Sequence, residues 1–366
     1  MKVAVITLHH VRNYGSLLQT YATQEILKKL NCEVEIIDFI PKGLTLSCGI
    51  KTIKASGNLI KDIIRKLGAS LVFSIEQADT IRFLNKNISL TKQTYHNFDE
   101  LLASPPLADA YISGSDQIWN TQNANLPTDI LAYYLEFAPE GKKRIAYASS
   151  IGKTEFSDDE AKNVKSHLEK YCAIGVREKQ AVELLKTIGI EASKHVLDPT
   201  LLLTPNEWKS FLGKQNKEKP YIFVYNLNRN PHIKSFASLL SREKNLPIIN
   251  FAHTLDFIPS AKNRLINSAY DFLYYLSNAE YVITDSFHGT AFSINFGKQF
   301  LTFSAPKFNS RIQSILELFS LESRLSAAAC NDITIIDKPL DKEGIERALS
   351  HERKTSLDFL KSALED

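Results

Sequence analysis

The chain has 366 residues, of which 44% are hydrophobic and 23% charged, and its 44 basic and 41 acidic residues give a net charge of +3. This composition belongs to a folded globular protein and excludes a disordered or fibrous one. The near balance of charge argues against a nucleic-acid-binding surface but still allows an anionic small substrate or a lipid head group.

The cysteines and the N-terminus give the expected compartment. Four cysteines lie far apart without a CxxC pair, which weakens metal, iron-sulfur and disulfide-scaffold interpretations and fits a reducing cytoplasm. The N-terminal MKVAVITLHH lacks the apolar core and cleavage site of a signal peptide, so it predicts a first core strand. No segment reaches the roughly 18 consecutive apolar residues that a membrane span needs. We expect a cytoplasmic protein that visits the inner face of a membrane at most.

The N-terminal half predicts a parallel sheet. KVAVITL (2–8), the helical pattern at 16–30 and VEIIDF (34–39) form a βαβ unit, and strands with so little alternation are buried on both faces. Residues 40–100 are less patterned and suggest an excursion. Further short apolar strands ending in small or polar residues are expected in four segments: 109–120, 144–152, 172–190 and 195–203.

A second series of elements follows a hydrophilic boundary at 204–220. Its expected strands are 221–227, 247–252, 281–286 and 299–304, with a helical pattern at 271–279. The predicted fold is α/β, with two doubly wound Rossmann-like domains facing a cleft. We predict an N-terminal domain at 1–205, a C-terminal domain at 206–340 and a closing amphipathic helix at 341–366.

The first candidate site is the loop LHHVRNYGSLLQ (8–19). Gly15 permits a tight turn, Ser16 is placed to cap the following helix, and the helix N-terminus favours an anion. Arg12 and the His9–His10 pair add charge and hydrogen bonds. A glycine turn before a helix also has purely structural uses. The GxGxxG fingerprint is absent, which disfavours a dinucleotide-binding dehydrogenase.

Three more segments carry polar residues after strands. Asp116 in SGSDQIWN (113–120) is a candidate for sugar hydroxyls or for orienting a catalytic group, or else caps a turn. Arg177 in GVREKQ is suited to bidentate contact with a carboxylate or phosphate. The alternative is a salt bridge from Arg177 to Glu178 or to Asp198, which precedes Pro199.

The stretch YVITDSFHGTAFSINFG (281–297) places Asp285, Ser286 and His288 between apolar runs. A histidine here is suited to acid or base chemistry near neutral pH, and Gly289 and Thr290 open a helix whose N-terminus favours an anion. The nucleophile elbow GxSxG is missing, and no second spaced histidine supports a metal site. The alternative is a histidine satisfied inside the core.

These motifs together resemble one family. NYGSLLQTYA, SGSDQIWN, YASSIG, GVREK, LDPTLLL, VITDSFHGTAFS and NSRIQSILEL occur in this order between residues 13 and 318 and resemble the polysaccharide pyruvyl transferases. The resemblance implies a two-domain fold similar to the GT-B glycosyltransferases. It also implies transfer of pyruvate from phosphoenolpyruvate to a sugar as a cyclic ketal, with phosphate released and with no metal or organic cofactor.

The resemblance maps the family's SFHG histidine onto His288 and its VRE arginine onto Arg177, and Arg311 in NSR matches a recurring position. Together with the motifs described above, it leads to the following expected site residues. His288, Asp116 and Arg177 are expected to be catalytic. Donor contacts are expected from Arg177, Ser286, His288, Gly289, Thr290 and Arg311. Acceptor contacts are expected from Asn13, Tyr14, Gly15, Ser16, Gln19, Ser115, Asp116 and Asp198.

The acceptor is less defined by the resemblance. A lipid-diphosphate-linked galactose or N-acetylhexosamine of capsule or exopolysaccharide synthesis is expected, with no nucleic-acid partner. The basic and apolar residues of 51–66 suggest either a surface that touches anionic lipid at the plasma membrane or an ordinary surface helix. A GT-B glycosyltransferase that uses a nucleotide sugar and a non-catalytic glycan-binding relative are the alternative functions.

Overall fold

The computed structural model describes residues 1–11, 13–41, 59–120, 129–214, 219–252, 256–304 and 310–365. Two compact units divide the chain. Unit 1 comprises Met1–Pro199 and Thr355–Asp366, and unit 2 comprises Thr200–Lys354. The division lies close to the predicted end of the first domain at residue 205. The segment of the predicted closing helix, 341–366, is divided between the two units, because residues up to Lys354 belong to unit 2 and those from Thr355 to unit 1.

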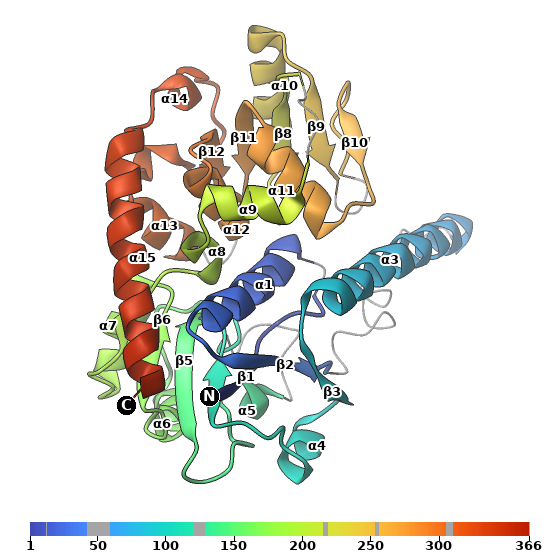
Figure 1. The fold of residues 1–366 in the computed structure, drawn as a ribbon. Coiled ribbons are helices and arrows are strands. Elements are labelled where there is room, and N and C mark those ends of the chain that lie inside the picture. The colour runs from blue at the N-terminus through green and yellow to red at the C-terminus, as the bar shows by residue number, and fades with distance from the viewer. Residues whose placement is uncertain are drawn as a thin grey trace. The chain divides into compact units, whose positions relative to one another are not determined.

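Unit 1 is built on a parallel sheet. Within the described ranges, its strands are β1 (Lys2–Ile6), β2 (Glu33–Phe39), β3 (Leu90–Tyr95), β4 (Ala110–Ser113), β5 (Lys143–Ser149), β6 (Ala173–Val176) and β7 (Lys194–His195). They lie in the order β3-β2-β1-β4-β5-β6-β7 with parallel pairing throughout (Figure 1). The first six positions follow the 3-2-1-4-5-6 order of a Rossmann fold.

Helices cover both faces of this sheet. They are α1 (Tyr14–Lys29), α3 (Leu59–Asn87), α4 (Phe98–Ala103), α5 (Ile130–Tyr133), α6 (Asp158–Leu168) and α7 (Lys179–Thr187), joined by the end of α15 (Lys342–Glu365). One face packs its alternate strand residues on α4 to α7, through side chains such as Leu101, Tyr133, Leu168 and Leu185. The other face carries Ile112 and Tyr147 against Ile26 of α1 and Leu360 of α15. Successive side chains of a strand point to opposite faces of the sheet, so each strand contributes residues to both cores.

Unit 2 repeats the architecture. Its described strands are β8 (Ile222–Tyr225), β9 (Ile248–Phe251), β10 (Lys262–Arg264), β11 (Tyr281–Thr284), β12 (Gln299–Phe303) and β13 (Leu325–Ser326). They pair in parallel in the order β10-β9-β8-β11-β12-β13, which is again the Rossmann order. The predicted pair of doubly wound α/β domains is therefore confirmed. The cleft between them stays a prediction.

The helices of unit 2 also lie on both faces. They are α8 (Pro199–Leu202), α9 (Pro205–Leu212), α10 (His232–Lys244), α11 (Ala269–Asn278), α12 (Phe287–Asn295), α13 (Ser310–Leu318), the 3-10 turn η3 (Glu322–Arg324) and α14 (Thr334–Asp337). Phe236 of α10 and Ile336 of α14 pack on one face of the sheet. On the other face, Phe223 and Tyr225 meet Phe272 of α11 edge to face.

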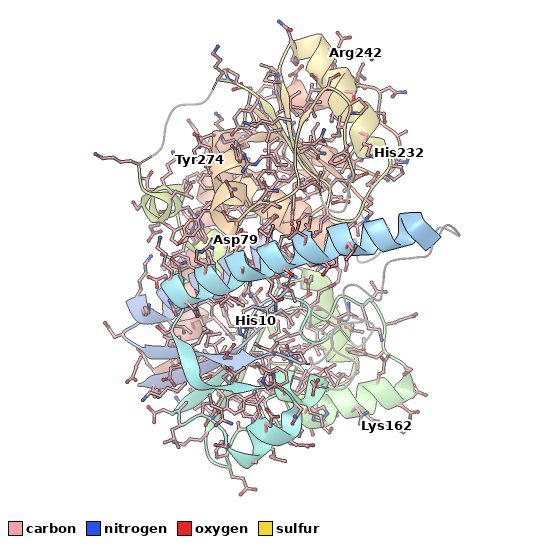
Figure 2. The ribbon with its side chains drawn as sticks, turned by 90° about the vertical axis from the view of Figure 1, so that its right-hand side faces the viewer. His10, Asp79, Lys162, His232, Arg242 and Tyr274 are labelled. Carbon is pink, nitrogen blue, oxygen red and sulfur yellow. The ribbon has the colours of Figure 1, made fainter. Side chains whose placement is uncertain are left out.

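The structure differs from the sequence expectations in two segments, 195–203 and 40–100. The segment 195–203 is mostly not a strand, because Pro199, whose fixed φ suits a first helical position, begins α8. Strand β3 went unrecognised within residues 40–100, since it lies at the sheet edge and exposes Lys92 and its neighbours, which hides the apolar pattern. The same region holds α3, a single helix on which Figure 2 labels Asp79.

Candidate active site

The candidate site residues of unit 1 gather where its central strands end. Parallel strands present their carboxyl ends at one edge, and ligands of doubly wound sheets bind where the strand order reverses. Here the reversal lies between β1 and β4, which pair directly. Thr7 follows β1, Ser115 and Asp116 follow β4, and Arg177 follows β6. A polar cluster therefore stands at the position that the fold reserves for ligands.

Arg177 is the centre of this cluster. Its side chain is 1% exposed, and its guanidinium contacts three carboxylates. Nη1 lies 3.0 Å from Asp198, Nε lies 3.3 Å from Glu178, and Nη2 lies 4.0 Å from Asp116. Burial acts to lower the pKa of Arg177, but the carboxylates of Glu178, Asp198 and Asp116 outweigh it and raise that pKa. The salt bridge that the sequence left open as an alternative is therefore present.

Asp116 has an unusual backbone. Its φ of +83° lies in the left-handed region, which costs a residue other than glycine about 1–3 kcal/mol and is found most often at functional sites. Its carboxylate accepts hydrogen bonds from the Ser16 hydroxyl and, at 3.0 Å, from the backbone N–H of Gln117. An isolated bridge to Ser149 holds the Asp116 backbone beside the end of β5. The strained position and its contacts fix where the carboxylate points.

Hydrogen bonds link three more of the predicted acceptor residues of unit 1, which are Gln19, Ser115 and Asp198. The Ser115 hydroxyl donates to Asp198 at 2.8 Å. Gln19 donates to the Thr7 hydroxyl at 2.9 Å, and Thr7 in turn donates to the Ser115 carbonyl at 2.7 Å. These side chains are all buried. Helix α1 and the ends of β1 and β4 therefore form one continuous polar network, assembled from residues far apart in the sequence.

The start of α1 corrects two details. The helix begins at Tyr14, and its cap is Asn13, whose side chain accepts from the Gly15 N–H at 3.0 Å. Ser16 lies within the first turn, so its hydroxyl is available to Asp116 rather than to the helix end. Gly15 is likewise helical rather than part of a tight turn. Tyr14 is buried at 8% exposure.

Glu178 is a site residue that the sequence reasoning did not select. It is 2% exposed, and its Oε1 accepts from the Ser150 hydroxyl at 2.7 Å as well as from Arg177. Oε2 has no hydrogen-bond partner among the described residues. Its position directly after Arg177, at the end of a buried strand, was the available signal. With Asp116 and Asp198, Glu178 is one of three carboxylates that contact Arg177.

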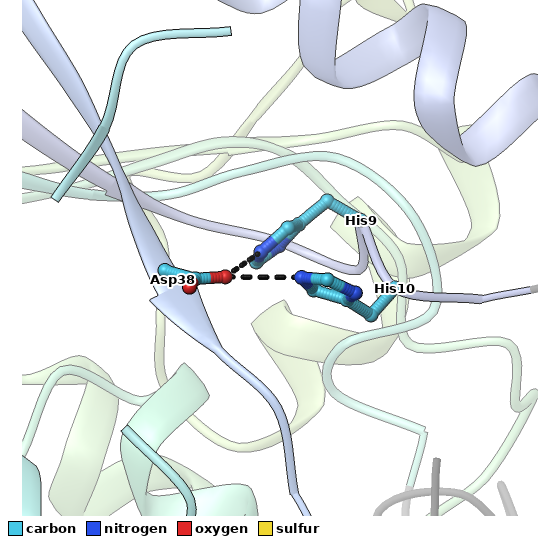
Figure 3. A group of neighbouring side chains, drawn as sticks. All are labelled: His9, His10 and Asp38. Carbon is cyan, nitrogen blue, oxygen red and sulfur yellow. Dashed lines mark hydrogen bonds and ion pairs between the residues drawn. The ribbon is translucent and has the colours of Figure 1, made fainter. Parts of the chain in front are cut away.

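A second group lies beside it at the ends of β1 and β2. This group consists of His9, His10 and Asp38, whose possible metal-ligand atoms lie within 4.8 Å of one another (Figure 3). Among the described residues it is the group of side chains with this arrangement. Burial opposes ionisation of Asp38, but hydrogen bonds from His10, His9 and Thr94 outweigh it and lower the pKa of this carboxyl far below its usual range. Burial lowers the pKa of His10.

Unit 2 also has polar residues at the carboxyl edge of its sheet, and we call this cluster and the one around Arg177 in unit 1 the two polar edges. Ser286 caps α12, accepting from the Gly289 N–H at 3.4 Å. Thr290 is fully buried, and its hydroxyl contacts the Ser286 carbonyl at 3.0 Å and Thr302 at 2.9 Å. His288 is 2% exposed in the first turn of the helix, with its ring edge to face with Phe287. Helix α12 therefore begins at Phe287, before the predicted Gly289 and Thr290.

Asp285 connects the two central strands of unit 2. Its carboxylate accepts from the backbone N–H groups of Leu227 and Asn228, at 2.7 and 2.9 Å, in the loop after β8. Burial raises the pKa of Asp285 to about 6, more than these hydrogen bonds lower it. The contact spans β8 and β11, where the strand order of this sheet reverses. Arg311 is half-buried in the first turn of α13.

The predicted residues therefore form two sets. Those of unit 1 are Asn13, Tyr14, Gly15, Ser16, Gln19, Ser115, Asp116, Arg177 and Asp198. Those of unit 2 are Ser286, His288, Gly289, Thr290 and Arg311. The sequence had grouped Arg177 with the donor residues of the second set. The structure instead joins Arg177 to the residues predicted for the acceptor.

A comparison with protein families decides the identity. The model of the family described as polysaccharide pyruvyl transferase matches residues 13–305, which is more than half of the chain. The chain belongs to the polysaccharide pyruvyl transferase family. It is therefore an enzyme of a pyruvyl-transferring family. In this pyruvyl transferase the matched region contains most residues of both polar edges described above, although Thr7 lies before it and Arg311 just beyond it.

Solved structures are similar to this pyruvyl transferase only distantly. A UDP-GlcNAc 2-epimerase from Neisseria meningitidis is 10% identical, with 99% of this chain and 94% of that chain covered and a TM-score of 0.47. A UDP-glucosyltransferase from Polygonum tinctorium is 11% identical, with 100% and 98% covered and a TM-score of 0.48. The comparison with curated proteins found no match. No helix in the described part of the pyruvyl transferase has the length and apolarity to cross a membrane.

Proposed function

We propose that this enzyme transfers pyruvate from phosphoenolpyruvate to a sugar, forming a cyclic ketal across two hydroxyls and releasing phosphate. The single observation that carries the proposal is the family match over residues 13–305. The two polar edges support it, because each stands at the ligand-binding position of a doubly wound sheet.

The reaction sets out what the site must supply. A proton is added to the methylene carbon of phosphoenolpyruvate, which leaves an oxocarbenium-like centre at the neighbouring carbon. One sugar hydroxyl attacks that centre and loses its proton to a base. The second hydroxyl then displaces phosphate, which leaves with its bonding electrons and with the proton of that hydroxyl. An acid, a base and groups that stabilise an anionic donor are therefore needed.

We assign the acceptor sugar to the edge of unit 1. The carboxylates of Asp116, Glu178 and Asp198 surround the Arg177 guanidinium, and carboxylates accept the hydrogen bonds that neutral sugar hydroxyls donate. Asp116 is the proposed base for the attacking hydroxyl. Arg177 is then a positioning residue that holds Asp116, Glu178 and Asp198, rather than a clamp on the donor.

We assign phosphoenolpyruvate to the edge of unit 2. The first N–H groups of α12 have no partner within the helix and favour an anion, with Ser286 and Gly289 forming the cap. His288 in this first turn is the proposed proton donor or phosphate contact. Arg311 on α13 is the proposed cationic partner of the donor, and Thr290 supports the turn by its contact with Thr302. This chemistry requires no organic cofactor.

The proposed acceptor is a lipid-diphosphate-linked galactose or N-acetylhexosamine of capsular or exopolysaccharide synthesis, reached at the inner face of the plasma membrane. The basic and apolar residues of 51–66 motivate the membrane contact. Residues 51–58, with Lys51 and Lys54, and the side chains of Lys61, Arg65 and Lys66 on α3 lie outside the described residues, so this part of the proposal rests on the sequence.

The test is an assay with defined donors and acceptors. The full chain is incubated with phosphoenolpyruvate or a nucleotide sugar and with lipid-linked acceptors, while phosphate and nucleotide release are followed. We expect phosphate release with phosphoenolpyruvate and, by mass spectrometry, an acceptor that has gained pyruvate with loss of water. Nucleotide release instead would indicate a glycosyltransferase. A chain that binds glycan but releases nothing from either donor would indicate a non-catalytic relative.

A further inference from the structure

The ends of β1 and β2 bring together two histidines and a carboxylate. These strands pair in parallel, so residues that follow β1 lie beside the end of β2. His9 and His10 follow β1, and Asp38 lies near the end of β2. Both Nε2 atoms point at the same oxygen of Asp38, as Figure 3 shows, at 3.3 Å from His9 and 3.0 Å from His10.

The second ring nitrogen of His9 fixes its tautomer. Nδ1 lies 3.0 Å from the carbonyl oxygen of Thr7. A carbonyl oxygen only accepts hydrogen bonds, so Nδ1 carries the proton. In the neutral ring Nε2 then carries a lone pair and is a hydrogen-bond acceptor. It faces the Asp38 carboxylate, which is also an acceptor. Two acceptors at 3.3 Å in a buried place repel each other unless a cation lies between them, either a second ring proton or a metal ion.

The distances fit a metal ion. With metal–ligand bonds of about 2.0–2.1 Å, tetrahedral geometry separates neighbouring ligand atoms by about 3.3 Å. The His9–Asp38 and His10–Asp38 distances of 3.3 and 3.0 Å are close to this value, and the donor atoms of all three residues lie within 4.8 Å of one another. The three donor atoms are therefore grouped closely enough that they could hold one metal ion.

The surroundings resemble the outer shell of a metal site. A ligating histidine usually donates its other N–H to a carbonyl or carboxylate, which is what His9 does to Thr7. Ligating carboxylates are themselves hydrogen-bonded, and the second oxygen of Asp38 accepts from the Thr94 hydroxyl at 2.6 Å. The His9 side chain is 0% exposed, whereas those of His10 and Asp38 are each 12% exposed, which leaves one side open to water.

We propose that His9 Nε2, His10 Nε2 and the Asp38 carboxylate bind a divalent transition-metal ion of the Zn²⁺ class. Two imidazoles and one carboxylate suit Zn²⁺, Co²⁺ or Fe²⁺, with the remaining position taken by water or by an oxygen of a ligand. The sequence had predicted no metal, because it gave no spaced pair of histidines. The proposal is independent of the proposed pyruvyl transfer, which needs no metal, so either one can fail alone.

The experiment is a metal titration of the full chain. After treatment with a chelator, the protein is titrated with Zn²⁺ by calorimetry and with Co²⁺ by visible absorption. We expect the chain to bind one equivalent of either ion. Bound Co²⁺ should give visible absorption bands, which disappear when Zn²⁺ replaces it. The midpoint of thermal unfolding should be higher with the ion than without it.

Variants separate this site from adventitious binding. Outer-shell changes weaken metal sites by about 10-fold to 100-fold, so Thr94→Val should fall in that range and Asp38→Asn and His10→Gln should lose more than about 100-fold. His96→Gln, an exposed histidine of the same unit, is the matched control and should bind as the wild type does. If Asp38→Asn, which changes a residue inside strand β2, fails to fold, His10→Gln, which lies in the loop after β1, decides the question.

Two results would overturn the proposal. One is the absence of stoichiometric uptake, or uptake that all three variants retain. The other is an NMR spectrum of the metal-free chain in which His9 carries protons on both ring nitrogens and does not lose either when Zn²⁺ is added. The cluster would then be a buried imidazolium–carboxylate pair.

Discussion

Arg177 and Asp198 form an ion pair of 3.0 Å in which the arginine side chain is 1% exposed and the aspartate side chain 0%. The pair joins the end of β6 to the start of α8 across the carboxyl edge of the sheet of unit 1. Glu178 and Asp116 also approach the same guanidinium, so this one side chain contacts three carboxylates. The acidic edge of unit 1 depends on this arginine for its structure.

Replacing Arg177 with methionine should therefore destabilise the fold. The variant keeps most of the side-chain volume but removes the guanidinium from three buried carboxylates, and breaking a buried ion pair in this way costs about 3–5 kcal/mol. Chemical denaturation measures the change in unfolding free energy. The control is Arg82→Met on α3, where the arginine side chain is 75% exposed beside Asp79 and the loss should not exceed about 1 kcal/mol. Equal losses in the two variants would show that Arg177 has no structural role.

Asp116→Asn tests the proposed base. The amide keeps the shape of the side chain but cannot take a proton, so kcat should fall by about 100-fold or more. The KM for phosphoenolpyruvate should stay unchanged, because that substrate is assigned to unit 2. Steady-state phosphate release measures both quantities. Asp109→Asn, a carboxylate with 57% of its side chain exposed in the same unit, is the matched control. A normal kcat in Asp116→Asn would exclude the base role.

His288→Ala tests the proposed proton donor. Loss of a general acid lowers the rate by about 100-fold to 10,000-fold, so phosphate release should disappear while circular dichroism still shows a folded chain. His351→Ala, an exposed histidine on α15, should keep its activity. Retained turnover in a folded His288→Ala variant would refute the catalytic role.

Asp285 predicts a pH dependence of stability. Burial raises its pKa from 3.8 to about 6, so the folded chain holds this proton more tightly than the unfolded chain does. The stabilisation is complete below pH 3.8 and is lost as the pH rises through 6, by about 3 kcal/mol in all.

Asp285→Asn removes this pH-dependent contribution to the free energy of unfolding. Between pH 4 and 7 the wild type should therefore lose about 2 kcal/mol of unfolding free energy relative to the variant, because part of the effect lies below pH 4. Denaturation curves of both proteins at several pH values measure the difference, in which the titration of other groups cancels. A difference that stays constant over this range would contradict the raised pKa.

Gly289 is required by close packing. A Cβ at this position would overlap the hydroxyl and the Cβ of Thr284 at the end of β11. Gly289→Ala should therefore destabilise unit 2 by about 1–3 kcal/mol, the usual cost of overpacking. In the control, Gly68→Ala on α3, the new Cβ meets no atom within 4 Å, and the better helix propensity of alanine should stabilise by up to about 1 kcal/mol. Thermal unfolding of the two variants compares them.

The sequence by itself determined the class of fold and the family. Apolar strands without alternation must be buried on both faces, so segments such as 2–8 and 281–286 predicted parallel sheets covered by helices. The motifs, taken in order, pointed to the pyruvyl transferases before the family match confirmed it. The sequence did not predict strand β3, because an edge strand shows little apolar pattern. It also did not predict helix α8, because the segment LDPTLLL is as apolar as either a strand or a helix would be.

The tertiary structure alone decided which side chains meet. Asp198 contacts Arg177, and Asp38 contacts His9, because parallel strands bring separate loops to one edge of the sheet. The sequence pattern around these residues does not indicate which of them will meet. It also decided what each residue does: Arg177 holds carboxylates, Asn13 rather than Ser16 caps α1, and Glu178 joins the site. Local pattern fixes which faces are buried, while hydrogen bonds and charge pairing depend on contacts that form only when the sheet is assembled.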